Sequence, residues 1–77
     1  MAPKYHRRQH LSRPATRARL RRVQLGLSQA QVAELAGLPQ PYVSKIERRE
    51  AVRQEDMAAV AGVLGLTPEE LMEEIAL

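Results

Sequence analysis

Residues 28–48 read SQAQVAELAGLPQPYVSKIER and carry the pattern of two short helices joined by a tight turn. Ser28 followed by Gln31 has the form of a capping box, in which each side chain accepts a hydrogen bond from a free backbone N–H group at the helix start. A helix is therefore expected at residues 29–36. Gly37 can adopt the positive φ that ends this helix at once.

The next helix is expected from about Pro41 to Arg48, because proline fits the first helical position. The positions where the two helices must touch are small or apolar: Val32, Ala33, Ala36, Gly37, Leu38, Val43 and Ile46. Ala33 matters most, since a larger side chain would hold the helices apart. The outward face of the second helix then carries Gln40, Pro41, Ser44 and Lys45. This arrangement is a helix-turn-helix, in which the helix at residues 41–48 can enter a major groove.

Three more helices are expected around this pair. The first runs from Pro14 to about Leu25 and stops at Gly26. The fourth carries apolar residues at i, i+3, i+4 and i+7 and ends at Gly65; these residues are Met57, Val60, Ala61 and Leu64. A second capping box at residues 67–70 opens the fifth helix, with Leu71, Met72 and Ile75 on one side. The predicted fold is all-α, with five short helices and no strand.

Composition limits the functional classes. A chain of 77 residues makes one small domain, and the absence of cysteine excludes disulfides and thiolate metal sites. Phe and Trp are absent and Tyr occurs twice, which disfavours a sheet core and aromatic platforms for base stacking. With no apolar run of membrane-spanning length and no signal peptide, we expect a cytoplasmic protein without membrane contact.

Charge is divided unevenly along the chain. Residues 1–22 hold eight basic residues and no acid, whereas residues 54–77 hold six acidic residues and no base. This pattern favours a module that binds nucleic acid with one face, although a solvated basic tail is the alternative. We interpret residues 1–13 as a basic arm and residues 14–77 as the DNA-binding domain. The arm's basic residues are Lys4, Arg7, Arg8 and Arg13.

The sequence resembles the lambdoid phage repressor and Cro family of helix-turn-helix proteins, also called the XRE type. The resemblance covers about residues 18–72 without a gap and is carried by RVQLGLSQ (22–29), Val32-Ala33, Ala36-Gly37-Leu38, Ile46-Glu47 and AGVLGLT (61–67). It implies a lambda-repressor-like domain with the helix-turn-helix at the second and third helices. The implied function is a transcriptional regulator, more specifically a repressor, that binds a pseudo-palindromic operator on double-stranded DNA as a homodimer through the major groove.

The resemblance also implies residue roles. Gln29 would contact a phosphate and support Gln40, the first base reader, for which an A·T pair is the natural target. The other base-reading positions are Pro41, Ser44 and Lys45, and the backbone contacts are Ser28, Gln29, Tyr42, Arg48, Arg49 and Arg53. Arg22 and Glu47 match a buried ion pair, whereas Arg21 lacks such a match and is expected to be solvated. The dimer interface would use Val52, Pro68, Leu71, Met72 and Ile75.

Two positions depart from the family pattern. Pro41 stands where relatives often have a side chain that hydrogen-bonds a base, so only an apolar contact remains, such as one to a thymine methyl group. Arg49 replaces the glycine that commonly ends the third helix, where positive φ is costly for other residues. Either the helix runs on past Arg49 or the loop differs from that of the family.

Other signals are weak. His6 and His10 lack the further ligands that a metal site needs, and the acidic residues 69–74 fit a helix start, so no metal and no cofactor is expected. The sequence has no nucleophile–base pair and no phosphate-binding glycine loop, which argues against an enzyme. Because no further domain follows Leu77, we expect a stand-alone Cro-like protein, a restriction-modification controller or an antitoxin. An alternative class is an antitoxin or coactivator-type module that binds a protein, either a toxin or a polymerase subunit.

Overall fold

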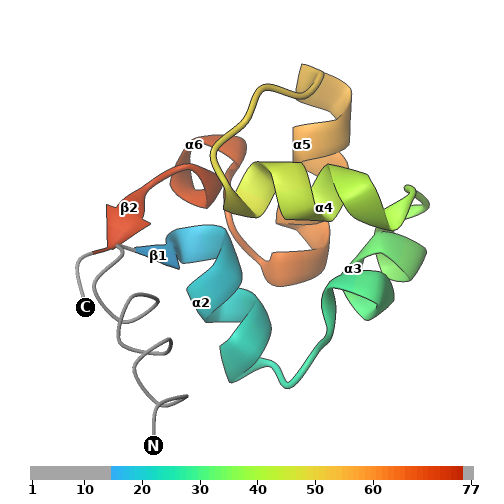
Figure 1. Ribbon diagram of the computed structural model, residues 1–77, viewed down its shortest axis with the longest axis horizontal. Helices are drawn as coiled ribbons and strands as arrows, with labels where there is room; N and C mark the ends of the chain where they lie inside the picture. The colour runs from blue at the N-terminus through green and yellow to red at the C-terminus, as the bar shows by residue number, and fades with distance from the viewer. Residues whose placement is uncertain (1–14, 76–77) are drawn as a thin grey trace, which may run out of the picture.

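The computed structural model describes residues 15–75. The basic arm and the two histidines therefore lie outside the described residues. Within residues 15–75 the chain forms five helices and one short strand pair (Figure 1): β1 (Ala15–Thr16), α2 (Arg17–Gln24), α3 (Gln29–Ala36), α4 (Gln40–Glu47), α5 (Gln54–Leu64), α6 (Pro68–Leu71) and β2 (Glu74–Ile75). The prediction of an all-α fold with five helices is confirmed.

The turn signals in the sequence place the helix ends as expected. Ser28 and Gln31 form the complete capping box that opens α3, and Gly37 ends this helix with a φ of 74°. Thr67 and Glu70 form the second box at the start of α6. A hydrogen bond from the backbone N–H of Thr67 lowers the pKa of Glu70, because it stabilises the charged carboxylate.

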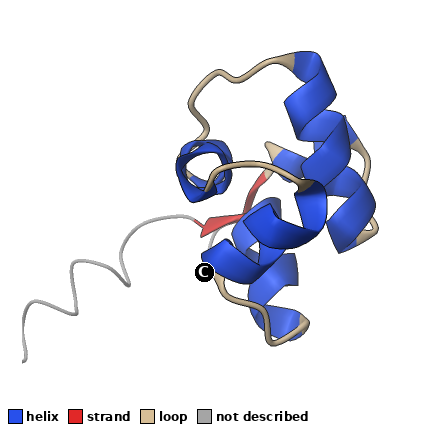
Figure 2. Cartoon of the chain, turned by 90° about the vertical axis from the view of Figure 1, so that its right-hand side faces the viewer, coloured by secondary structure: helices blue, strands red, loops and turns tan. Residues whose placement is uncertain are grey.

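The predicted start of the first helix is wrong. This helix begins at Arg17 rather than at Pro14, because Thr16 has extended backbone angles and caps it by accepting a hydrogen bond from the N–H of Arg19. The extended conformation lets Thr16 pair with Glu74 in an antiparallel strand pair of two residues on each side. Figure 2 shows this pair at the edge of the helical body. The strand pair is an addition to the all-helical prediction.

The fifth helix is also shorter than expected. It ends at Leu71, with Met72 as its C-cap, and Ile75 lies in β2 instead of on the helix. The chain leaves the helix so that the carbonyl of Glu73 can accept a hydrogen bond from the N–H of Arg17, at 2.8 Å. The apolar residues expected on one helical face are thus divided between a helix end and a strand.

The core lies between α3, α4 and α5, with contributions from α2 and α6. α3 packs against both α4 and α5. The buried apolar residues are Ala18, Val32, Ala33, Val43, Ile46, Val60, Ala61, Leu64 and Leu71. Of the positions predicted to join the two central helices, Ala36 and Leu38 pack against this core and Gly37 is exposed.

Arg21 was expected to be solvated, and this prediction is wrong. Its side chain is half-buried, and its Nε donates to the carbonyl of Leu64 at 3.0 Å. That carbonyl lies at the C-terminal end of α5, where helical carbonyl groups lack partners and a positive charge is favourable. Arg21 therefore ties α2 to the end of α5.

The third helix does not run on past Arg49. α4 ends at Glu47, and Arg49 itself adopts the left-handed conformation, with a φ of 62°. Its N–H donates to the carbonyl of Ile46 at 3.0 Å, and the N–H of Glu50 donates to the carbonyl of Lys45 at 2.8 Å. These two bonds form a Schellman motif with arginine at the position that glycine usually occupies. The side chain of Arg49 also pairs with Glu74 of β2 at 3.5 Å.

We expect Arg49→Gly to be more stable than Arg49→Ala by about 1 kcal/mol, because glycine removes the steric cost of a left-handed residue. Both variants lose the exposed ion pair with Glu74, so their difference isolates the backbone contribution. Urea denaturation of the two variants measures it. Equal free energies of unfolding would show that the backbone at Arg49 is not strained.

Candidate nucleic-acid interface

Arg22 and Glu47 form an ion pair that joins α2 to α4. The Nε of Arg22 lies 2.5 Å from Oε2 of Glu47, and its Nη2 lies 3.2 Å from Oε1. The two side chains are only 15% and 6% exposed. The remaining Nη1 donates to the carbonyl of Leu27 at 2.9 Å. The guanidinium thus holds both the start of α3 and the end of α4 against α2.

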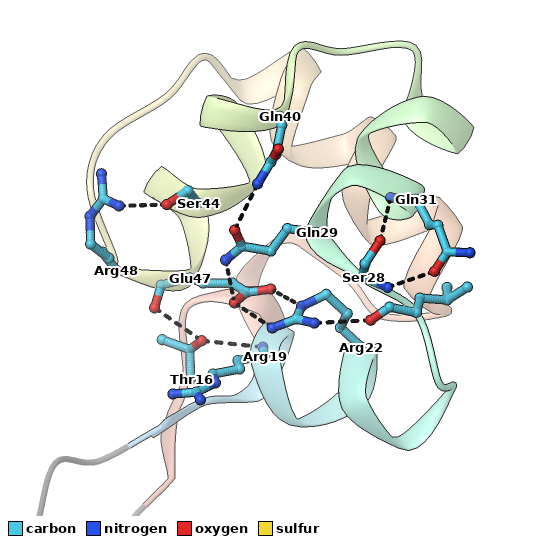
Figure 3. A network of polar contacts seen from close by, with 11 residues as sticks. Thr16, Arg19, Arg22, Ser28, Gln29, Gln31, Gln40, Ser44, Glu47 and Arg48 are labelled. Atoms are coloured by element: carbon cyan, nitrogen blue, oxygen red, sulfur yellow. Dashed lines mark hydrogen bonds and ion pairs between the residues drawn. The ribbon is translucent and has the colours of Figure 1, made fainter. Parts of the chain in front are cut away.

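Two glutamines extend this ion pair to the start of α4. The Nε2 of Gln29 donates to Oε1 of Glu47 at 3.0 Å. The Nε2 of Gln40 donates to Oε1 of Gln29 at 3.3 Å. Figure 3 shows the continuous chain of contacts from Arg22 through Glu47 and Gln29 to Gln40. It links the first residue of α4, which is exposed, to a buried carboxylate.

Thr16 holds the opposite end of α4. Its hydroxyl donates to the backbone carbonyl of Glu47 at 3.2 Å, and the residue is 4% exposed. The same hydroxyl caps α2, so a single side chain fixes the start of one helix and the end of the other. This contact could not be expected from the sequence, since a threonine before a helix signals a cap and gives no sign of a second partner.

The outward face of α4 carries the residues predicted to read bases. Gln40, Pro41 and Lys45 are exposed, while Ser44 is half-buried. The hydroxyl oxygen of Ser44 accepts a hydrogen bond from Nη1 of Arg48. The serine proton remains able to donate to a base or phosphate.

Each arginine predicted to contact the DNA backbone is paired with an acid in the structure. Arg48 pairs with Glu50 at 2.9 Å and Arg49 with Glu74 at 3.5 Å. Arg53 pairs with Glu55 and with Asp56, both at 3.4 Å. The arginine side chains are about half or more exposed, and pairs exposed on both sides contribute roughly 0–1 kcal/mol, so a phosphate can compete with Glu50, Glu55 and Glu74 for them. Asp56 is only 7% exposed, so its contact with Arg53 is not a pair of this kind.

The ion pair between Arg48 and Glu50 shifts the pKa values of both side chains. The hydrogen bond from Arg48 lowers the pKa of the Glu50 carboxyl and raises that of the arginine. No sequence motif pointed to this acid, although it lies directly beside the predicted phosphate-contacting arginines.

The other predicted backbone contacts lie at helix starts. Ser28 is exposed, and its hydroxyl oxygen accepts the capping hydrogen bond from the N–H of Gln31 at 3.0 Å. Gln29 is half-buried at the start of α3, and Tyr42 is half-buried in the first turn of α4. Together with Gln40 and Pro41, these residues lie at the starts of α3 and α4.

Of the residues predicted to form a dimer interface, Val52, Pro68, Leu71 and Met72 differ in exposure. Leu71 is 0% exposed and belongs to the core, so this side chain is unavailable to a partner. Val52 and Met72 are half-buried and pack against the core, and Pro68 is half-buried at the start of α6. Leu71 fails as an interface residue because the short α6 turns it inward.

Comparison with known families agrees with this geometry. The helix-turn-helix family model matches residues 19–71, which is more than half of the chain. The chain belongs to the XRE-type helix-turn-helix family. No curated protein and no solved structure matches it.

As a member of the XRE-type family, the protein is a DNA-binding transcription regulator. The family domain binds double-stranded DNA and is regulatory, and it is not typically catalytic. Among residues 15–75, no helix has the length and apolar content needed to cross a bilayer. The same residues contain no group of three or more potential metal ligands.

We expect Arg22→Ala to lower the free energy of unfolding by about 3–5 kcal/mol, because it leaves the carboxylate of Glu47 buried without its cation. Arg19→Ala is the matched control, since Arg19 lies on the same helix with an exposed side chain. Thermal or urea denaturation measures both variants. Equal stability of the two variants would show that the pair is not structural.

Proposed function

We propose that the protein is a repressor that binds a pseudo-palindromic operator as a homodimer, with α4 in the major groove of each half-site. The observation that carries the proposal is the contact between Gln29 and Gln40, which joins the starts of α3 and α4. The exposed face of α4 is polar, whereas Val43 and Ile46 on its other face are fully buried. A helix held in this way offers its first turn to base edges.

Gln40 is the proposed main base reader. Its side chain is exposed at the first position of α4, and one of its amide hydrogens is held by Gln29. The other hydrogen and the carbonyl oxygen match N7 and the N6 amine of adenine. Ser44 and Lys45 would read neighbouring bases, and Pro41 would offer an apolar contact.

Phosphate contacts would position this reading face. The proposed contacts from the described residues are Ser28, Gln29, Tyr42, Arg48, Arg49 and Arg53. The basic arm would add Lys4, Arg7, Arg8 and Arg13, which have no acidic neighbours in the sequence. Each phosphate that such a cation neutralises releases counterions from the DNA, which favours binding. These contacts fix orientation and carry no base information.

The proposed homodimer would use the surface around Val52, Pro68, Met72 and Ile75. A two-fold symmetric dimer places its reading helices about one helical turn apart, roughly 10 base pairs. We therefore propose an operator with two related half-sites at this spacing.

A protein-interaction module is the second candidate. It is favoured by three large apolar side chains that are 57%, 42% and 64% exposed, namely Val23, Leu25 and Leu35. Such a module would act as an antitoxin or coactivator and bind a toxin or a polymerase subunit. Retention on DNA at moderate salt separates this candidate from the repressor.

Selection of bound sites from a random duplex library tests the proposed repressor directly. We expect two half-sites spaced by roughly 10 base pairs, and we expect Gln40→Ala to lose about 1–3 kcal/mol of binding on the selected operator, with a relaxed preference at one base pair per half-site. Equal losses on operator and random DNA would make Gln40 a backbone contact. Failure to enrich any sequence would contradict sequence-specific binding.

We expect Glu50→Gln to strengthen binding to any duplex, because it frees Arg48 for a phosphate. The slope of log affinity against log salt should steepen by about 0.9 per protomer, the value for one added phosphate contact. Glu69→Gln is the control, since it removes the same charge from an exposed position on α6. A slope that changes equally in both variants would show that the pair of Arg48 with Glu50 has no role at the DNA.

A further inference from the structure

We propose that Glu47 determines which base Gln40 prefers, by fixing the hydrogen-bond polarity of Gln29 and, through it, that of Gln40. Glu47 is thus a positioning residue in addition to an ion-pair partner. The proposal rests on the proposed role of Gln40 as a base reader. It assigns to a buried carboxylate the choice between two purines in the major groove.

The first step is set by the chemistry of Glu47. A carboxylate accepts hydrogen bonds and donates none, so any neutral amide that contacts it must turn its NH₂ group inward. Gln29 does so, with its Nε2 3.0 Å from Oε1 of Glu47. The Glu47 side chain is only 6% exposed, so little water is available to satisfy a reversed amide. The Gln29 amide therefore has one favourable orientation, with its NH₂ group toward Glu47.

The second step follows from this orientation. When the NH₂ group of Gln29 faces Glu47, its carbonyl oxygen faces Gln40, whose Nε2 lies 3.3 Å away. A reversed Gln40 would place two carbonyl oxygens against each other. Gln40 must therefore act as a donor toward Gln29, and the polarity of the buried carboxylate reaches the exposed end of α4 (Figure 3).

The third step concerns the groups that Gln40 keeps free. One N–H group and the carbonyl oxygen remain for the groove. This donor and acceptor pair matches adenine, which presents the N7 acceptor and the N6 donor. Guanine presents two acceptors, N7 and O6, and the carbonyl oxygen of Gln40 would be repelled by one of them. The chain of contacts thus favours adenine over guanine.

Arg22 makes the arrangement rigid. Its Nε and Nη2 hold both oxygens of Glu47, at 2.5 and 3.2 Å, so the carboxylate cannot rotate away from Gln29. A planar guanidinium bound in this bidentate way restricts its partner more than a single contact would. The ion pair that fixes the fold therefore also fixes the direction of the amides.

Gln29→Lys reverses the polarity and tests the proposal. An ammonium group donates only, so it would keep the contact to Glu47 and would also donate toward Gln40. The carbonyl oxygen of Gln40 would then turn to the new side chain, and both of its N–H groups would face the groove. Two donors match guanine, so we expect the preference at this base pair to reverse.

The readout is the ratio of affinities for two duplexes that differ only by A or G at the position read by Gln40. We expect this ratio to move toward guanine by about tenfold or more, the discrimination that one bidentate contact supplies. Ala30→Lys is the matched control, because it adds the same charge at the next, exposed position of α3. It should raise affinity for both duplexes and leave their ratio unchanged.

Gln29→Met removes the polar contacts at nearly constant size and gives a second measurement. We expect its ratio to move toward one, with circular dichroism showing that the helices are retained. A wild-type ratio in either folded variant, Gln29→Lys or Gln29→Met, would overturn the proposal. Gln40→Ala distinguishes failure of the base-reading role of Gln40 from failure of the polarity set by Gln29. An unchanged ratio in Gln40→Ala would refute the base reader itself, whereas a flattened ratio there with no effect at position 29 would refute the polarity alone.

Discussion

A buried carboxylate that must be satisfied on every side holds this small domain together. Glu47 is at the end of α4 with only 6% of its side chain exposed, and it accepts hydrogen bonds from Arg22 and Gln29. An uncompensated charge at such a site is strongly destabilising, so the three helices that supply these groups are restricted to one arrangement. The apolar core is built from nine small and medium-sized residues, and their packing alone restricts the relative orientation of the helices less sharply.

The two short strands at the ends of the described chain, β1 and β2, both contact the C-terminal end of α4. Thr16 in β1 donates to the backbone carbonyl of Glu47, and Glu74 in β2 pairs with Arg49 just beyond α4. The antiparallel pairing of Thr16 with Glu74 keeps these two contacts side by side. The C-terminal end of α4 is therefore held by polar contacts from both strands, while Gln40 and Pro41 at its start stay exposed. A helix fixed in this way, with polar side chains exposed at its start, is suited to presenting them to a groove.

The sequence was informative where a physical rule acts locally. The capping box of Ser28 and Gln31 and the positive φ of Gly37 are properties of a few adjacent residues, so the turn between α3 and α4 could be predicted from them. The pairing of Arg22 with Glu47 came instead from the family resemblance, since two residues 25 positions apart have no local signal that joins them. The contact of Gln29 with Gln40 was expected on the same basis, but its continuation to Glu47 was not.

The errors arose where tertiary contacts override local preference. A strand pair of two residues has no periodicity to detect, so neither the late start of α2 nor the place of Ile75 could be read from the sequence. Apolar spacing suggested a longer fifth helix because no glycine marks its end after Leu71. Arg49 adopts a conformation that its side chain disfavours, since the Schellman hydrogen bonds of Arg49 and Glu50 and the ion pair with Glu74 compensate for it.

The central claim is that Gln40, held by a chain of contacts from Glu47, lies at the base edges when the protein binds DNA. The most direct measurement is nuclear magnetic resonance of the ¹⁵N-labelled protein on its selected operator, with the side-chain amides of Gln29 and Gln40 assigned. The account predicts nuclear Overhauser contacts from the Gln40 amide to base protons in the major groove, together with a Gln29 amide that stays hydrogen-bonded. It would be contradicted by a Gln40 amide without contact to any base while the complex is fully formed.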